Sequence, residues 1–275
     1  EVDFIQRITD VTQAASSSRF LRYGIPALIT GAVSFIALIF VCVYHMESVL
    51  ITADAILLVC AAVSVTGMLD CIRRDKDSPI YRMISMALAC FILGELLWIL
   101  RVCTGGDERG GFFPIGDLPW LGLYGFLLYA CLRVFEKTAD FKDKKYRRIT
   151  IIACLVQVFI VAINIVFYIP GDDLIFTILY CIPTGFLSFY TLTYLLASFG
   201  KSGILKGFRI YNITVFLMLI LDNINYLLFI HGVKNIEFIF KFCLALLLLA
   251  VTPAVYYGVQ KWSEQEGSGS HVSDR

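Results

Sequence analysis

Apolar residues along this chain are gathered into eight long stretches, separated by short polar segments. The stretches cover residues 22–46, 49–71, 80–103, 116–136, 148–170, 173–200, 205–232 and 236–262. A helix needs about 20 predominantly apolar residues to cross the hydrocarbon core of a bilayer, and each stretch meets that length. The pattern therefore predicts an all-α, polytopic membrane protein with eight transmembrane helices.

Composition indicates the same class of protein. Hydrophobic residues make up 59% of the chain, charged residues make up 16%, and the mean hydropathy is +0.78. Soluble domains carry about 25% charged residues. One apolar stretch is also typical of a buried helix in a soluble protein, but eight in succession leave no room for a water-soluble domain. We expect a multi-pass protein of a cell (plasma) membrane, in bacteria the inner membrane, with membrane lipids and no nucleic acid as partners.

The basic residues are distributed unevenly between the two sides of the predicted bundle. All but four of the 23 Lys and Arg lie near the two chain termini or in and beside the segments that follow the second, fourth and sixth stretches, which is one side of the membrane. The four on the other side are Arg101, Arg109, Lys234 and Lys241. Because Lys and Arg in short loops stay on the cytoplasmic side, we expect both chain termini to be cytoplasmic.

Five segments follow from this topology. They are a cytoplasmic amphipathic segment at residues 1–21, a four-helix unit at 22–136, a basic cytoplasmic loop at 137–147, a second four-helix unit at 148–262, and a cytoplasmic tail or added linker at 263–275. Glu95 is followed by Trp98 in the first unit, and Asp222 by Tyr226 in the second. Because each unit has an even number of helices, this short match favours a parallel repeat of the two units.

Motifs for catalysis or metal binding are scarce. The chain has no HExxH, no GxSxG and no Gly-rich phosphate-binding loop, and its nine cysteines form no CxxC pair, which favours a role in helix packing. Gly105 to Glu108 match part of the diguanylate cyclase signature, but their glycine-rich surroundings indicate a flexible outer loop. Asp70 resembles the acid of the eight-helix lysoplasmalogenase-type hydrolases, although its place beside Arg73 and Arg74 favours an interfacial ion pair.

Ionisable residues within the predicted spans are the first candidates for function, because each is costly to place in a bilayer. Side chains three or four residues apart share a helix face, which groups Glu95 with Trp98, and Asp222 with Asn225. The predicted outward-facing ligand site contains Glu95, Trp98, Arg101, Asp117, Trp120, Tyr124, Asp222, Asn225 and Tyr226. Alternatively, these groups pair across helices, Arg101 with Glu95 or Asp117 for example, and only hold the bundle together.

The most specific part of the chain runs from Gly94 to Arg133. It combines Gly-Glu-Leu-Leu-Trp, a glycine-rich loop and the segment Phe-Pro-Ile-Gly-Asp-Leu-Pro-Trp. This order resembles the eight-helix membrane regions found N-terminal to bacterial diguanylate cyclases and histidine kinases. The residues that carry the resemblance are Glu95, Trp98, Pro114, Asp117 and Tyr124, with Thr252 and Pro253 in the last helix. Pro119 departs from the family's pattern, as does the lack of an output domain after Trp262.

The resemblance implies a sensory or ligand-binding membrane module. Such a module binds a small or lipid-like ligand from the outer side and signals to a cytoplasmic domain or protein. Three other functions stay open: an ion- or proton-coupled transporter that uses Glu95 and Asp222, an intramembrane lipid hydrolase, and a scaffold subunit of a membrane complex. Since catalytic motifs are missing from the sequence, we do not expect an enzyme, and we expect neither a metal nor another cofactor.

Overall fold

The computed structural model describes residues 2–45, 48–76, 78–104, 118–136, 144–166, 174–198, 207–230, 233 and 236–269. Within these ranges it describes the side chains except at 2–20, 102, 135–136, 145–146, 164–165, 174–181, 226, 229–230 and 264–269. The described residues form eight α-helices and no strand. The helices are α1 (Val2–Tyr44), α2 (Val49–Arg74), α3 (Pro79–Cys103), α4 (Leu118–Glu136), α5 (Lys144–Val166), α6 (Leu174–Ser198), α8 (Arg209–Ile230) and α9 (Glu237–Gly269).

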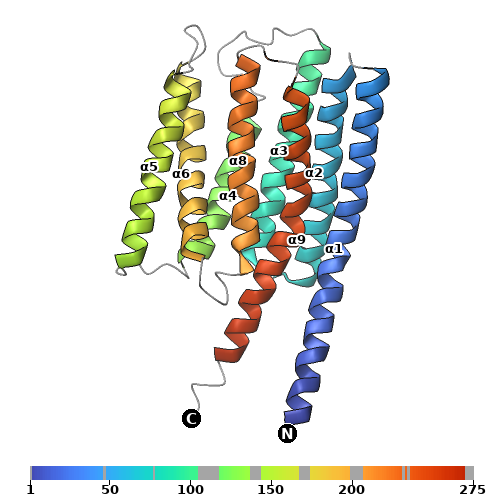
Figure 1. Cartoon of the computed structure of the whole chain (residues 1–275), viewed down its shortest axis with the longest axis vertical. Helices are drawn as coiled ribbons and strands as arrows, with labels where there is room; N and C mark the ends of the chain where they lie inside the picture. Colours follow the sequence, from blue (N-terminus) through green and yellow to red (C-terminus); the bar gives the residue numbers. More distant parts are fainter. Residues whose placement is uncertain are drawn as a thin grey trace.

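The helices stand side by side along the long axis of the molecule and form one bundle (Figure 1). α1 begins and α9 ends at the same end of this bundle, as an even number of alternating helices requires. We call this the terminal end and the opposite one the distal end. α2 and α9 therefore both begin at the distal end and run in the same direction.

The predicted helices are confirmed, since each apolar stretch overlaps one helix. Among the described residues, four helical segments are long and apolar enough to cross a membrane, and Leu118–Val134 is apolar but shorter. α5, α6 and α8 have 23, 25 and 22 residues, or about 33 Å and more at 1.5 Å per residue. The four segments are Leu21–Tyr44, Val49–Arg74, Pro79–Arg101 and Glu237–Ser263.

Two helices extend beyond the predicted spans, both at the terminal end. Residues 2–21, predicted as a separate amphipathic segment, continue directly into the first apolar stretch as part of α1, and this part projects from the bundle (Figure 1). No Gly or Pro interrupts the chain before Gly24, so nothing in the sequence breaks the helix there. α9 likewise continues past Trp262 to Gly269, which makes the first part of the predicted tail helical.

α9 packs against helices of both predicted four-helix units. α9 packs against α2, α8 and α1, α3 packs against α2 and α4, and α6 packs against α4, α5 and α8. If the two predicted units are matched helix by helix, α1 with α5, α2 with α6, α3 with α8 and α4 with α9, the contact of α2 with α9 corresponds to that of α6 with α4. The contacts within the two units correspond as well, whereas the contact of α1 with α9 has no comparable counterpart between α5 and α4 in the described residues.

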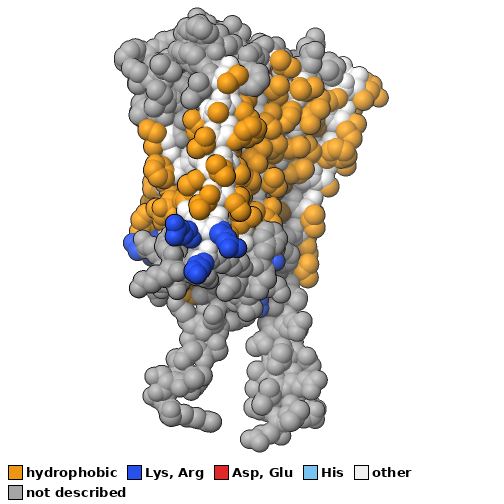
Figure 2. Space-filling view, turned by 60° about the vertical axis from the view of Figure 1, so that its left-hand side comes forward, with side chains coloured by type: hydrophobic (Ala, Val, Ile, Leu, Met, Phe, Trp, Pro, Cys, Tyr) orange, Lys and Arg blue, Asp and Glu red, His pale blue; other side chains and the backbone are white. Residues whose placement is uncertain are grey.

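The surface of the bundle is strongly apolar. Large apolar side chains are exposed along both outlying helices, for example Leu28 and Ile36 on α1 and Val158 and Phe159 on α5. Figure 2 shows such side chains over most of the height of one face, with Lys and Arg gathered at its lower edge. Water-soluble monomers rarely expose a continuous apolar surface of this extent.

Candidate functional site

A buried ion-pair network joins α2 to α9 near the distal end. The Lys241 ammonium lies 2.6 Å from Asp54 Oδ1 and 3.1 Å from Glu237 Oε1. These residues are 8%, 7% and 6% exposed, so water screens the charges poorly. Because α2 and α9 begin at the same end, residues near the start of each helix meet at the same depth. The ligand site predicted from sequence included none of these three residues.

Glu95 on α3 lies close to this network, and one of its carboxyl oxygens has no hydrogen-bond partner among the described residues. The residue is 6% exposed, and its Oε2 is buried without a hydrogen bond in the described part of the chain. Asp54, Lys241 and Asp222 are near enough to act electrostatically on its carboxyl group. Since Lys241 is the one cation in that set, carboxyl groups outnumber positive charges around Glu95.

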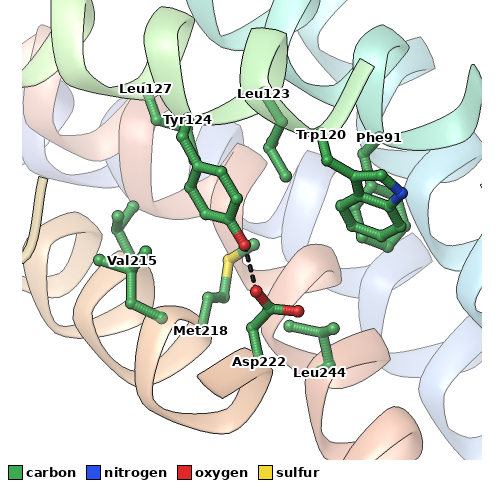
Figure 3. A pocket seen from close by; sticks show the side chains of 10 residues that line it. Phe91, Trp120, Leu123, Tyr124, Leu127, Val215, Met218, Asp222 and Leu244 are labelled. Atoms are coloured by element: carbon green, nitrogen blue, oxygen red, sulfur yellow. Dashed lines mark hydrogen bonds between the residues drawn. The ribbon is translucent and has the colours of Figure 1, made fainter. Parts of the chain in front are cut away.

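Asp222 on α8 contacts Tyr124 on α4. The Tyr124 hydroxyl donates a hydrogen bond to Asp222 Oδ2, and the two side chains point toward one another (Figure 3). They line a small cavity together with Phe91, Trp120, Leu123, Leu127, Val215, Met218, Leu219 and Leu244. The cavity measures about 10 Å³, and one water molecule needs at least about 10–15 Å³. In this conformation the cavity therefore holds at most one water molecule.

Trp120 on α4 forms part of the cavity wall, and its indole ring lies close against α3. A Cβ atom added at Gly94 would lie 2.8 Å from Trp120 Nε1 and 3.0 Å from Cε2, so the glycine is what lets the indole approach α3. The Trp120 ring also meets Phe91 edge to face, with centroids 5.1 Å apart. Gly94 directly precedes Glu95 in the chain, so the indole lies against the same turn of α3 that carries Glu95.

The structure describes only some of the other residues in the predicted ligand site. Trp98 and Arg101 are half-buried near the distal end of α3, and no ion pair joins Arg101 to Glu95 among the described residues. Asn225 is half-buried on α8, and its Oδ1 has no hydrogen bond within the described chain. Asp117 and the side chain of Tyr226 lie outside the described residues. The structure thus brings Glu95, Trp120, Tyr124 and Asp222 into one region.

The polar side chains of this region are of several chemical kinds. Among the described residues, no group of three or more His, Cys, Asp or Glu is arranged to hold a metal ion. The eight cysteines whose side chains are described are all free. What the region offers is a set of buried carboxyl groups, one ammonium group, a phenol and an indole between apolar walls.

Comparison with known proteins found no match for this chain among protein-family models, curated proteins or solved structures.

Proposed function

We propose that this chain is an eight-helix membrane protein that binds a small ligand with a cationic head from the outer side and signals to a cytoplasmic partner. Its membrane location is supported by the four helices long enough to cross a bilayer and by the exposed apolar faces of α1 and α5. The uneven distribution of Lys and Arg supports a cytoplasmic terminal end. The distal end is then the outer side.

The same proposal includes the parallel repeat of two four-helix units. The repeat is supported by helix contacts that correspond between the two units. When the units are matched helix by helix, the contact of α2 with α9 becomes the contact of α6 with α4, and both are present. Glu95 on α3 and Asp222 on α8 take equivalent positions in this scheme. The two carboxyl groups are close enough to interact electrostatically. This is expected if the two acids are related by the repeat and both face the axis between the two units.

The observation that carries the ligand-binding proposal is the buried Oε2 atom of Glu95, which has no hydrogen bond within the described part of the chain. A buried polar group without a partner costs free energy, and buried ionisable groups in membrane helices mark functional sites. An ammonium head beside Glu95 supplies the missing partner and offsets the excess of carboxyl groups. The neighbouring Trp120 and Tyr124 rings suit a cation attached to an apolar body.

The small volume of the cavity connects binding to signalling. Since the cavity holds at most one water molecule, a larger ligand fits only if α3 and α4 move relative to α8 and α9. A ligand that binds the opened arrangement preferentially shifts the population toward it. α9 carries Lys241 of the ion-pair network and runs on to Gly269 at the terminal end, so it is the helix we propose to transmit the movement. This agrees with the resemblance to membrane sensor regions.

The experiment compares hexylammonium, hexanol and hexanoate as probes of equal chain length. The purified protein in lipid nanodiscs is titrated with each, and its thermal unfolding is followed. We expect hexylammonium to raise the melting temperature, Glu95→Gln and Asp222→Asn to abolish that rise while the protein stays folded, and Asp75→Asn, outside the site, to keep it. Equal responses to all three probes, or an unchanged response in Glu95→Gln, would refute a cation site at Glu95.

A proton- or cation-coupled transporter is the second candidate. It is favoured by Lys241, which lies between two carboxylates and so resembles a site where a proton or cation exchanges with an ammonium group. Vesicles that contain the protein distinguish the two functions. Accumulation of labelled hexylammonium that collapses when the ion gradient is removed supports transport, whereas saturable binding without accumulation supports the sensor.

A further inference from the structure

A second cavity lies between α1, α2 and α9, toward the terminal end and away from Glu95. It measures about 220 Å³, roughly fifteen to twenty times the space that one water molecule needs. Its wall is mostly apolar or small and consists of Tyr23, Pro26, Ala27, Val63, Ser64, Thr66, Gly67, Leu249 and Thr252. Thr66 is exposed, so the groove opens at the surface of the bundle beside it.

A basic cluster lies at one end of this groove. Tyr23, which lines the groove, donates its hydroxyl hydrogen bond to Asp70 Oδ2 over 2.8 Å. Arg22 and Arg74 also pair with that oxygen, at 3.3 and 3.1 Å, which confirms the ion pair predicted for Asp70. The two arginine side chains remain 51% and 52% exposed. Two guanidinium groups against one carboxylate leave a net positive charge beside an apolar groove.

We propose that the groove and its basic cluster bind one anionic phospholipid of the inner leaflet, with an acyl chain in the groove and the phosphate at Arg22 and Arg74. The proposal rests on the membrane orientation given above, in which the terminal end is cytoplasmic. Basic pockets between helices on that side recognise anionic head groups, and guanidinium groups bind phosphate through charge-assisted hydrogen bonds. A free phosphate ion would use the arginines but gain nothing from the apolar wall.

The test uses the full chain in detergent and native mass spectrometry, with phosphatidylglycerol and phosphatidylcholine of equal acyl chains as probes. The cluster has a net charge of about one, and one positive charge adds roughly 1 kcal/mol of attraction to an anionic lipid, so we expect phosphatidylglycerol to bind about fivefold more tightly. The double variant Arg22→Gln/Arg74→Gln should lose this preference, and Arg22→Lys/Arg74→Lys should keep most of it. Arg148→Gln, an exposed arginine on α5, is the matched control and should change nothing.

The groove is tested separately from the charges. Thr66→Phe fills the groove from its exposed edge and should weaken binding of both lipids, whereas Ala62→Phe, exposed one turn away on α2, should not. Equal affinity for the two lipids in the natural protein would overturn the proposal. So would complete competition by millimolar inorganic phosphate together with normal binding in Thr66→Phe, since that result describes a phosphate site. Glu95→Gln should keep the lipid preference, so a failure of the outer site is distinguishable from a failure of this one.

Discussion

Lys241 is the basic residue that neutralises buried carboxylates near the distal end. Its ammonium group bridges Asp54 from α2 and Glu237 from its own helix, and each of the three side chains is at least nine-tenths buried. Buried ion pairs gain little over apolar packing, but removing one partner leaves the other uncompensated. Here one cation faces two carboxylates, so its loss is more damaging than the loss of either acid.

We therefore expect Lys241→Met to lower the free energy of unfolding by about 3 kcal/mol or more, the range measured when a buried pair is broken. Chemical unfolding in detergent micelles measures this. Asp54→Asn added to Lys241→Met should recover part of the loss, because it removes one of the two stranded carboxylates. Lys144→Met, at an exposed lysine of α5, is the control. A Lys241→Met variant as stable as that control would show that the network contributes nothing to stability.

At the scale of the helices, the contact of α3 with α4 depends on a glycine. The Trp120 indole occupies the space that a side chain at Gly94 would need. Gly125, further along α4, has nothing within 4 Å of an added Cβ atom. The two glycines lie in the same helix pair but have opposite surroundings, which makes them a matched test of close packing.

Gly94→Ala should lower the free energy of unfolding by about 1–2 kcal/mol, since overpacking costs about 1–3 kcal/mol and the higher helix propensity of alanine returns up to about 1 kcal/mol. Gly125→Ala should be neutral or slightly stabilising. Thermal unfolding of the two variants gives the comparison. In a Trp120→Phe background the cost of Gly94→Ala should shrink. Equal effects of the two glycine substitutions would mean that the indole does not lie against α3.

The helices were predictable from sequence because each is a long apolar run bounded by polar residues, a local signal. The partners of single side chains were not. Lys241 and Asp54 are 187 residues apart, and no local pattern indicates that α2 and α9 run side by side. The pairing of Arg101 with Glu95, considered as an alternative to a ligand site, is not found among the described residues. The full length of α1 was not predicted, because an amphipathic pattern indicates a helix but does not show whether that helix continues into the next one.

At the scale of the whole molecule, polar groups of different kinds gather near opposite ends of an apolar bundle. Glu95, Asp222 and the Lys241 network lie toward the distal end, whereas Arg22, Arg74 and Asp70 lie toward the terminal end. α9 packs on α2 and α8 between these regions and extends beyond the bundle at the terminal end. Under the proposed orientation, a ligand reaches the acidic site from outside, and α9 carries its effect inward.

The acidic site opens outward only if the terminal end of the bundle faces the cytoplasm, and labelling of single cysteines in intact cells measures this orientation directly. In a background without the native cysteines, we expect His45→Cys, Thr104→Cys and Val233→Cys, all exposed near the distal end, to react with a membrane-impermeant maleimide. Lys76→Cys and Lys144→Cys, exposed at the terminal end, should react only after the membrane is permeabilised. The opposite pattern, or labelling of both groups from the same side, would contradict an outward-facing acidic site in an eight-helix membrane protein.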